Sequence, residues 1–219
     1  EVWNETKTAF EKDFTCYTLT MAGFAGAKPY PSPSFENWKA GIATYIKTNK
    51  IEKPIVIGHS MGGGLALALA ADYPDLIGKI VVVDELPCLA ALRNTSFKSK
   101  ENNDCSPMVT QMTAMNEKQF YEMQKQAMPR LLQDASKLEM VVDWSVKSDR
   151  KTFAQMYCDF FNTDLRERIS TVKCPSLILL ESNFINLKPA IEEQYKNLKT
   201  ANFQYANKGL HFIMYDDKD

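Results

Sequence analysis

Residues 54–64, Pro-Ile-Val-Ile-Gly-His-Ser-Met-Gly-Gly-Gly, decide the fold class of this 219-residue chain. The apolar run 54–57 is typical of a strand buried on both faces of a parallel sheet. The glycines predict a tight turn, and the small residues of 65–72 predict a helix after it. A second apolar strand is expected at 80–83. Strand, helix and strand in this order form a βαβ unit, so we expect a parallel sheet with a right-handed crossover.

Hydrophobic periodicity also predicts elements on both sides of this unit. These are a short amphipathic helix at 3–10, a strand at 14–20, a helix capped by Ser34, a strand at 176–180, a helix at 187–198 and a last strand at 202–206.

The stretch from Leu86 to about Asp164 has a different pattern. It carries no convincing buried strand, is rich in Met, Gln and Lys, and is mostly helical in its periodicity. We interpret it as a helical cap inserted between two strands of the sheet. The expected organisation is therefore a first core part at 1–85, the cap at 86–165 and a second core part at 166–219.

The amino-acid composition is that of a globular domain and argues against two classes of protein, those that bind nucleic acid and those that span a membrane. The chain is 45% hydrophobic and 24% charged, as is ordinary for a globular domain, and 26 basic residues nearly balance 27 acidic ones. Without a basic block, nucleic acid is not an expected partner. The longest apolar stretch, around Leu65 to Ala71, is too short to cross a bilayer.

The motif Gly58-His59-Ser60-Met61-Gly62 places a serine between a predicted strand and a predicted helix. A serine in such a G-x-S-x-G turn has a strained backbone, and the flanking glycines let strand and helix pass without Cβ clashes. We therefore predict that Ser60 is a nucleophile. The backbone N–H of Met61, the residue after it, is the expected oxyanion donor.

A serine hydroxyl needs a base within hydrogen-bond reach. The chain has two histidines, His59 and His211. His59 adjoins Ser60, and consecutive residues in such a turn point apart, so we do not expect it to serve. His211 follows the last predicted strand and is the predicted general base.

These motifs resemble those of the α/β-hydrolase superfamily, in particular its capped esterase and lipase-like members. Besides the Ser60 motif, the loop at 21–26, the strand entry at 174–178 and the Gly-x-His-Phe sequence at 209–212 match the family pattern. The resemblance implies a mostly parallel sheet with helices on both faces and a cap. It also implies a serine carboxylesterase that uses no cofactor and no metal.

The chain departs from the family pattern at its ends. The family has a strand before the helix that 3–10 resembles, and the loop after that strand gives a second oxyanion donor. It usually also has a helix beyond the position of Asp219. We therefore expect that the first strands, the last helix and the second donor lie outside this sequence.

The chain also departs from the family pattern at the acidic residue that orients His211. In most relatives an aspartate follows the strand after the cap, but here Phe184 stands at that place. Some relatives take the acid from the end of the strand before the cap, which points to Asp84. Glu181 and Glu85 remain alternatives.

The cap carries many methionines and aromatic residues, which suit an adaptable apolar pocket. We expect a small-molecule ester with a hydrophobic part as the substrate, and Trp144 as a substrate-binding residue. Two other functions stay open on the same fold. One is a slow-turnover or non-catalytic receptor for a small molecule, and the other is a cofactor-free perhydrolase, lactonase or C–C hydrolase.

The five cysteines show no Cys-x-x-Cys spacing of a zinc site. Cys88 and Cys105 lie in one polar, loop-like stretch, and a disulfide between them would hold the start of the cap. Such a bridge would indicate an exported protein, periplasmic or secreted, and free thiols would indicate a cytoplasmic one.

Overall fold

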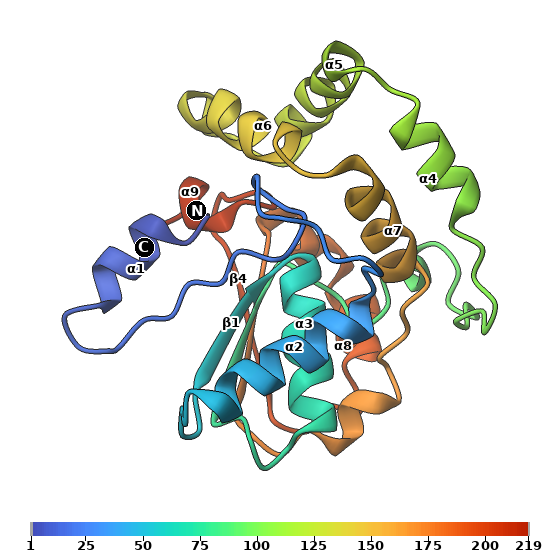
Figure 1. Cartoon of the computed structure of the whole chain (residues 1–219). Helices are drawn as coiled ribbons and strands as arrows, with labels where there is room; N and C mark the ends of the chain where they lie inside the picture. Colours follow the sequence, from blue (N-terminus) through green and yellow to red (C-terminus); the bar gives the residue numbers. More distant parts are fainter. Residues whose placement is uncertain (1, 219) are drawn as a thin grey trace.

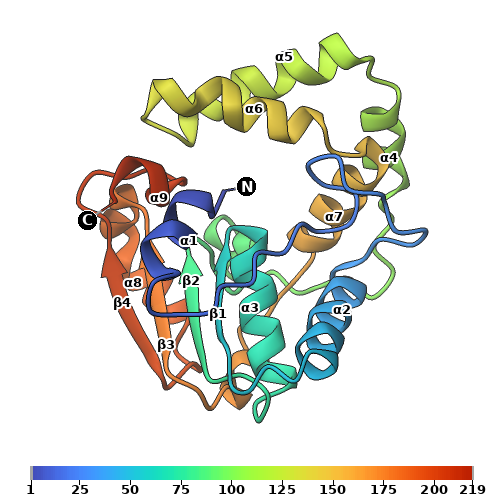
Figure 2. The same ribbon diagram turned by 60° about the vertical axis from the view of Figure 1, so that its left-hand side comes forward.

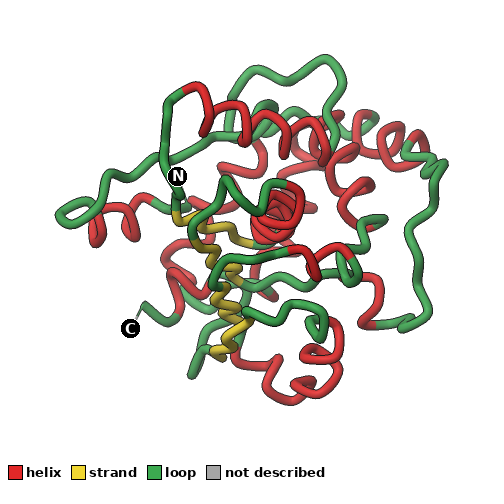
Figure 3. Tube along the Cα trace, turned by 90° about the horizontal axis from the view of Figure 1, so that it is seen from below, coloured by secondary structure: helices red, strands yellow, loops and turns green. Residues whose placement is uncertain are grey.

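A computed structural model describes residues 2–218. In that range one parallel sheet has the order β1-β2-β3-β4, with β1 at Ile55–His59, β2 at Lys79–Val83, β3 at Ser176–Leu180 and β4 at Ala201–Tyr205. In register, Gly58 of β1 faces Val82 of β2, and Val82 faces Ile178 of β3. Figure 3 shows the strands as a narrow band with helical segments on either side of it. The predicted parallel sheet is confirmed.

The two central strands are completely buried on one face of the sheet. Ile80, Val82, Ile178 and Leu180 on this face are at most 1% exposed. Helices α2 at Phe35–Thr48, α3 at Met61–Asp72 and α8 at Lys188–Gln194 contribute to the same core, and α7 at Arg150–Phe161 adds Met156 and Phe160 to it. Helix α3 packs directly on β1 and β2, because its small residues allow a close approach to the strands. This packing fixes the start of α3 at the end of β1.

The remaining helices contribute no residue to the buried part of that core. They are α1 at Asn4–Phe10, α4 at Ser106–Thr113, α5 at Glu117–Ala127, α6 at Leu138–Val146 and α9 at Ile213–Asp216. Short 3₁₀ turns occur at 89–92, 128–130, 135–137, 168–171 and 182–187. No helix within residues 2–218 is both long and apolar enough to cross a membrane.

Helices α4 to α7 form a layer above the carboxyl ends of the strands (Figures 1 and 2). This layer is connected to the loop 23–26 by three hydrogen bonds. The Asp149 N–H donates to the Gly23 carbonyl at 2.7 Å, and the Gly26 N–H donates to the Lys147 carbonyl at 3.1 Å. The Ala25 N–H donates to Ser148 Oγ at 3.3 Å. The helices between β2 and β3 therefore face the edge of the sheet where Ser60 lies.

The outer edge of β1 has no strand beside it among the described residues. Ile55 and Ile57 are 45% and 39% exposed, so β1 is not buried on both faces as its apolar sequence predicts. A groove of about 1590 Å³ lies at this edge, and Ile55, Ile57, Tyr17 and Leu19 are among the residues that line it.

The strand predicted at 14–20 is wrong. The segment is extended but has no regular secondary structure, and Phe14, Tyr17 and Leu19 are about half exposed. Its residues favour a strand, but a strand exists only where a neighbour supplies hydrogen bonds, and no described strand pairs with this segment.

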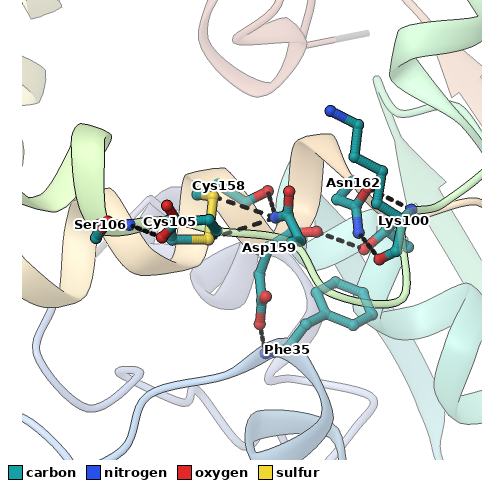
Figure 4. Close-up of a disulfide and its surroundings, with 10 residues drawn as sticks. Phe35, Lys100, Cys105, Ser106, Cys158, Asp159 and Asn162 are labelled. Atoms are coloured by element: carbon teal, nitrogen blue, oxygen red, sulfur yellow. Dashed lines mark hydrogen bonds between the residues drawn. A yellow bond between two sulfur atoms is a disulfide. The ribbon is translucent and has the colours of Figure 1, made fainter.

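The predicted disulfide between Cys88 and Cys105 is also wrong. Cys105 bonds instead to Cys158 of α7, and Cys88 is a free thiol without exposed surface. Figure 4 shows this bridge between the start of α4 and α7. Nearby, the Asn103 amide donates to the Cys158 carbonyl at 3.3 Å. The bridge thus joins two helices that pack against each other.

Replacing both Cys105 and Cys158 with serine should lower the free energy of unfolding. The bridge spans 53 residues, so its loss frees a long loop in the unfolded chain and should cost roughly 2 to 4 kcal/mol. Urea unfolding without reductant measures this loss. Cys16→Ser, a change at a half-buried free cysteine, is the control and should have little effect. Alkylation of both Cys105 and Cys158 in the non-reduced protein would contradict the assignment.

Candidate active site

Ser60 occupies the turn between β1 and α3 in a backbone conformation that non-glycine residues rarely adopt. Its φ is 55° and its ψ is −130°. A Cβ on Gly58 would lie 2.0 Å from the Gly62 carbonyl oxygen, so the motif requires glycine at Gly58. The Ser60 N–H donates to the Val83 carbonyl at 2.9 Å, which ties the turn to β2. The strained turn therefore holds Ser60 at the carboxyl edge of the sheet.

Asp84 follows β2 at the same edge and also has a positive φ, 50°. Its side chain is 3% exposed and accepts two hydrogen bonds. His211 Nδ1 donates to Oδ2 at 2.6 Å, and the Glu181 N–H donates to Oδ1 at 2.7 Å. Because a carboxylate only accepts, the hydrogen of a neutral His211 ring is on Nδ1, which leaves Nε2 as an acceptor. The structure thus brings His211 and Asp84 together in the arrangement that a general base needs.

The two alternative acids lie close by but do not take this place. The backbone N–H of Glu181 supports Asp84, and burial followed by the charge of Asp84 raises the pKa of its carboxyl above its usual value. Glu85 points into the core, where its Oε1 accepts from the Leu86 N–H at 2.7 Å. The Nδ1 of His211 is occupied by Asp84, so the geometry favours Asp84 over both glutamates.

Met61 is the first residue of α3, and its side chain is 9% exposed. The N–H groups of a helix's first turn have no partner within the helix, and the helix dipole favours negative charge there. The Met61 N–H lies at this helix start next to Ser60, and its role as an oxyanion donor stays a prediction.

Trp144 lies on α6 and is half-buried. It packs against an apolar cluster that includes Val142 of the same helix, Tyr215 and Phe212, the residue after His211. Trp144 and Phe212 thus pack against the same apolar cluster. The binding of substrate by Trp144 stays a prediction.

Two residues at the site have features that the sequence did not reveal. His59 Nε2 lies 2.8 Å from the carbonyl oxygen of His211, although the side chain of His59 cannot serve as the base of its neighbour Ser60. Glu85 is 3% exposed, and burial raises the pKa of its carboxyl to about 8, with a further contribution from the charge of Asp84. In the sequence, the only indication of these features was that His59 adjoins Ser60 and Glu85 adjoins Asp84.

Glu85→Gln should flatten the pH dependence of stability. The pKa of Glu85 is about 8 in the folded chain and ordinary in the unfolded chain, so its stabilisation is complete below about pH 4.5 and is lost as the pH rises through 8. Glutamine keeps an acceptor for the Leu86 N–H and never ionises. We therefore compare the free energy of unfolding of the variant with that of wild type at each pH. This difference should favour the variant by on the order of 1 kcal/mol or more at pH 8 relative to pH 5.

Urea unfolding at both pH values measures this difference. Glu122→Gln makes the same chemical change at an exposed position of α5 and serves as the control. If wild type and Glu85→Gln lost stability equally between pH 5 and pH 8, ionisation of Glu85 would not be the cause.

Among residues 2–218, no group of three His, Cys, Asp or Glu side chains converges in a way that could hold a metal ion.

Comparison with known proteins agrees with this architecture. The model of the alpha/beta hydrolase fold family matches residues 1–217. Pimeloyl-[acyl-carrier protein] methyl ester esterases from Vibrio atlanticus and Vibrio parahaemolyticus are 23% and 21% identical, and each match covers 81% of this chain and 69% of the relative.

Two solved structures show the same fold at low identity. The enol-lactonase from Burkholderia xenovorans has a TM-score of 0.76 at 19% identity, covering 97% of this chain and 79% of that one. A thermophilic esterase from Thermogutta terrifontis has a TM-score of 0.78 at 15% identity, covering 98% and 79%. With a family model that matches nearly its whole length, this chain belongs to the α/β-hydrolase family.

Proposed function

We propose that the protein is a serine hydrolase that cleaves carboxylic esters through an acyl-enzyme on Ser60. The observation that carries this proposal is the 2.6 Å hydrogen bond between His211 Nδ1 and the buried Asp84, at the sheet edge where Ser60 sits in its strained turn. Similarity to methyl ester esterases supports ester bonds as the target.

In the first step Ser60 Oγ attacks the ester carbonyl while His211 Nε2 takes the serine proton. Asp84 holds the ring in the required tautomer and stabilises the imidazolium that forms. The N–H of Met61 donates to the oxyanion, and the start of α3 adds its positive end. His211 then gives its proton to the leaving alcohol.

In the second step water takes the role of Ser60. His211 accepts a proton from the water as it attacks the acyl group, and the collapse of the intermediate returns that proton to Ser60. Residues of this chain carry out each proton transfer in this mechanism, and neither step uses a cofactor or a metal.

The substrate in this proposal is a small ester with a hydrophobic part. Segment 86–165 serves as a cap over the core parts 1–85 and 166–219, and its apolar cluster at α6 reaches the loop of His211 through Phe212. Trp144 belongs to this cluster and would contact the apolar part of the substrate.

A panel of chromogenic esters with acyl chains of increasing length tests the proposal. We expect turnover that requires Ser60 and that prefers one range of chain length. A ligand-dependent rise in thermal stability without turnover would instead identify a receptor. Turnover of lactones or C–C substrates in place of esters would identify a different reaction of the same residues.

A further inference from the structure

His59 is the last residue of β1, directly before Ser60, and its side chain contacts the loop that carries His211. Its Nε2 lies 2.8 Å from the backbone carbonyl oxygen of His211. The centroid of its ring is 4.5 Å from that of His211 and 5.0 Å from that of Phe212. On another side, Trp3 makes an edge contact at 6.5 Å. His59 therefore packs against three rings, and its hydrogen bond to the loop determines where its Nε2 points.

The partner of His59 determines which of its nitrogens carries the hydrogen. A carbonyl oxygen only accepts, so His59 must be protonated on Nε2. Desolvation of the ring, and next the neighbouring His211, hold the pKa of His59 well below its ordinary value. The ring is therefore neutral, and it adds no second positive charge beside His211 when that residue takes a proton.

The loop around His211 is tied to several parts of the fold. The Phe212 N–H donates to the Leu131 carbonyl at 3.0 Å, and the Ser182 N–H donates to the Gly209 carbonyl at 2.9 Å. These bonds connect the loop to the α5–α6 region and to the end of β3. The bond from His59 has a different consequence, because it connects the loop to β1, the strand that ends at Ser60.

We propose that His59 is a positioning residue that sets the distance between Ser60 and the ring of His211, by donating a hydrogen bond to the backbone of His211. The inference rests on the proposed function for its effect on turnover. A rigid link of this kind is valuable because a displacement of about 1 Å at the reacting groups can cost 10²-fold in rate.

The first test uses no substrate. The chain contains two histidines, so ¹⁵N imidazole spectra contain two rings, and His211→Ala assigns them. We expect His59 to be neutral and protonated on Nε2 throughout pH 5 to 8. A neutral His59 ring that carries its hydrogen on Nδ1 would exclude the proposed hydrogen bond and overturn the inference, whether or not the protein is an esterase.

The second test compares two amides of different length. His59→Gln places an N–H near the position of Nε2, whereas His59→Asn carries the same group one methylene shorter and cannot reach the carbonyl. We expect His59→Asn to lower kcat and the rate of labelling by a fluorophosphonate roughly 10- to 100-fold with KM little changed, and His59→Gln to restore the rate to within about fivefold.

Trp3→Leu is the packing control. It removes a ring that touches His59 without touching the hydrogen bond, so it should lower thermal stability and leave kcat close to wild type. Equal losses in His59→Gln and His59→Asn would assign His59 a packing role and overturn the inference. If wild type itself neither turns over esters nor reacts with the fluorophosphonate, the proposed function fails, and the ¹⁵N spectra still decide the hydrogen bond.

Discussion

Replacing Ser60 with alanine is expected to lower ester turnover by roughly 10³-fold or more. Alanine cannot form the acyl-enzyme, so only the oxyanion donor and substrate binding would remain. The fold should persist, because the Ser60 side chain caps no backbone group of α3 and alanine occupies the same small volume. The variant should also lose labelling by a fluorophosphonate probe.

Mass spectrometry of the labelled protein identifies the modified residue directly. Ser96→Ala, at an exposed serine of the segment after β2, is the matched control and should label like wild type. A thermal melt of both variants separates loss of chemistry from loss of fold. Labelling that persists in Ser60→Ala at another residue would disprove the role of Ser60.

Asp84→Asn is expected to lower turnover by roughly 10² to 10⁴-fold, with substrate affinity little changed. Asparagine tolerates the positive φ of Asp84, and its Oδ1 can still accept from the Glu181 N–H. The amide group, however, carries no charge to stabilise the imidazolium and no longer enforces the tautomer with hydrogen on Nδ1. The loss should therefore fall on kcat.

Glu181→Gln is the comparison variant, because it removes a carboxylate that interacts electrostatically with Asp84 and His211 and leaves the backbone bond to Asp84 in place. We expect a cost of less than tenfold. Steady-state kinetics show which of the two variants loses more turnover. A larger loss in Glu181→Gln would identify Glu181 as the acid, and a small loss in both variants would favour Glu85.

The parallel sheet and the Ser60 turn could be predicted because local sequence determines them. Gly58 has to be glycine for a steric reason, and the apolar run of β3 has the same bounds in the structure as in the prediction. The last strand and the helix before it were displaced by one residue or shortened, since element ends depend on packing that a sequence does not display.

The errors concern contacts between distant residues. Cys105 pairs with Cys158 because α4 packs on α7, and no pattern near Cys105 encodes that packing. The prediction of a strand at 14–20 was wrong because strand propensity does not show whether a neighbouring strand is present to pair with it. The bond from His59 to the His211 carbonyl crosses 152 positions of the chain, so only the folded loop reveals it.

The open edge of β1 has a consequence for the behaviour of the chain in solution. Residues 55–59 contain no proline and no Asp, Glu, Lys or Arg, and these are the residues with which proteins usually protect an edge strand. A second extended chain can pair with such an edge and continue the sheet. We therefore expect β1 to be the point from which this chain aggregates as its concentration rises, which light scattering over a concentration series measures.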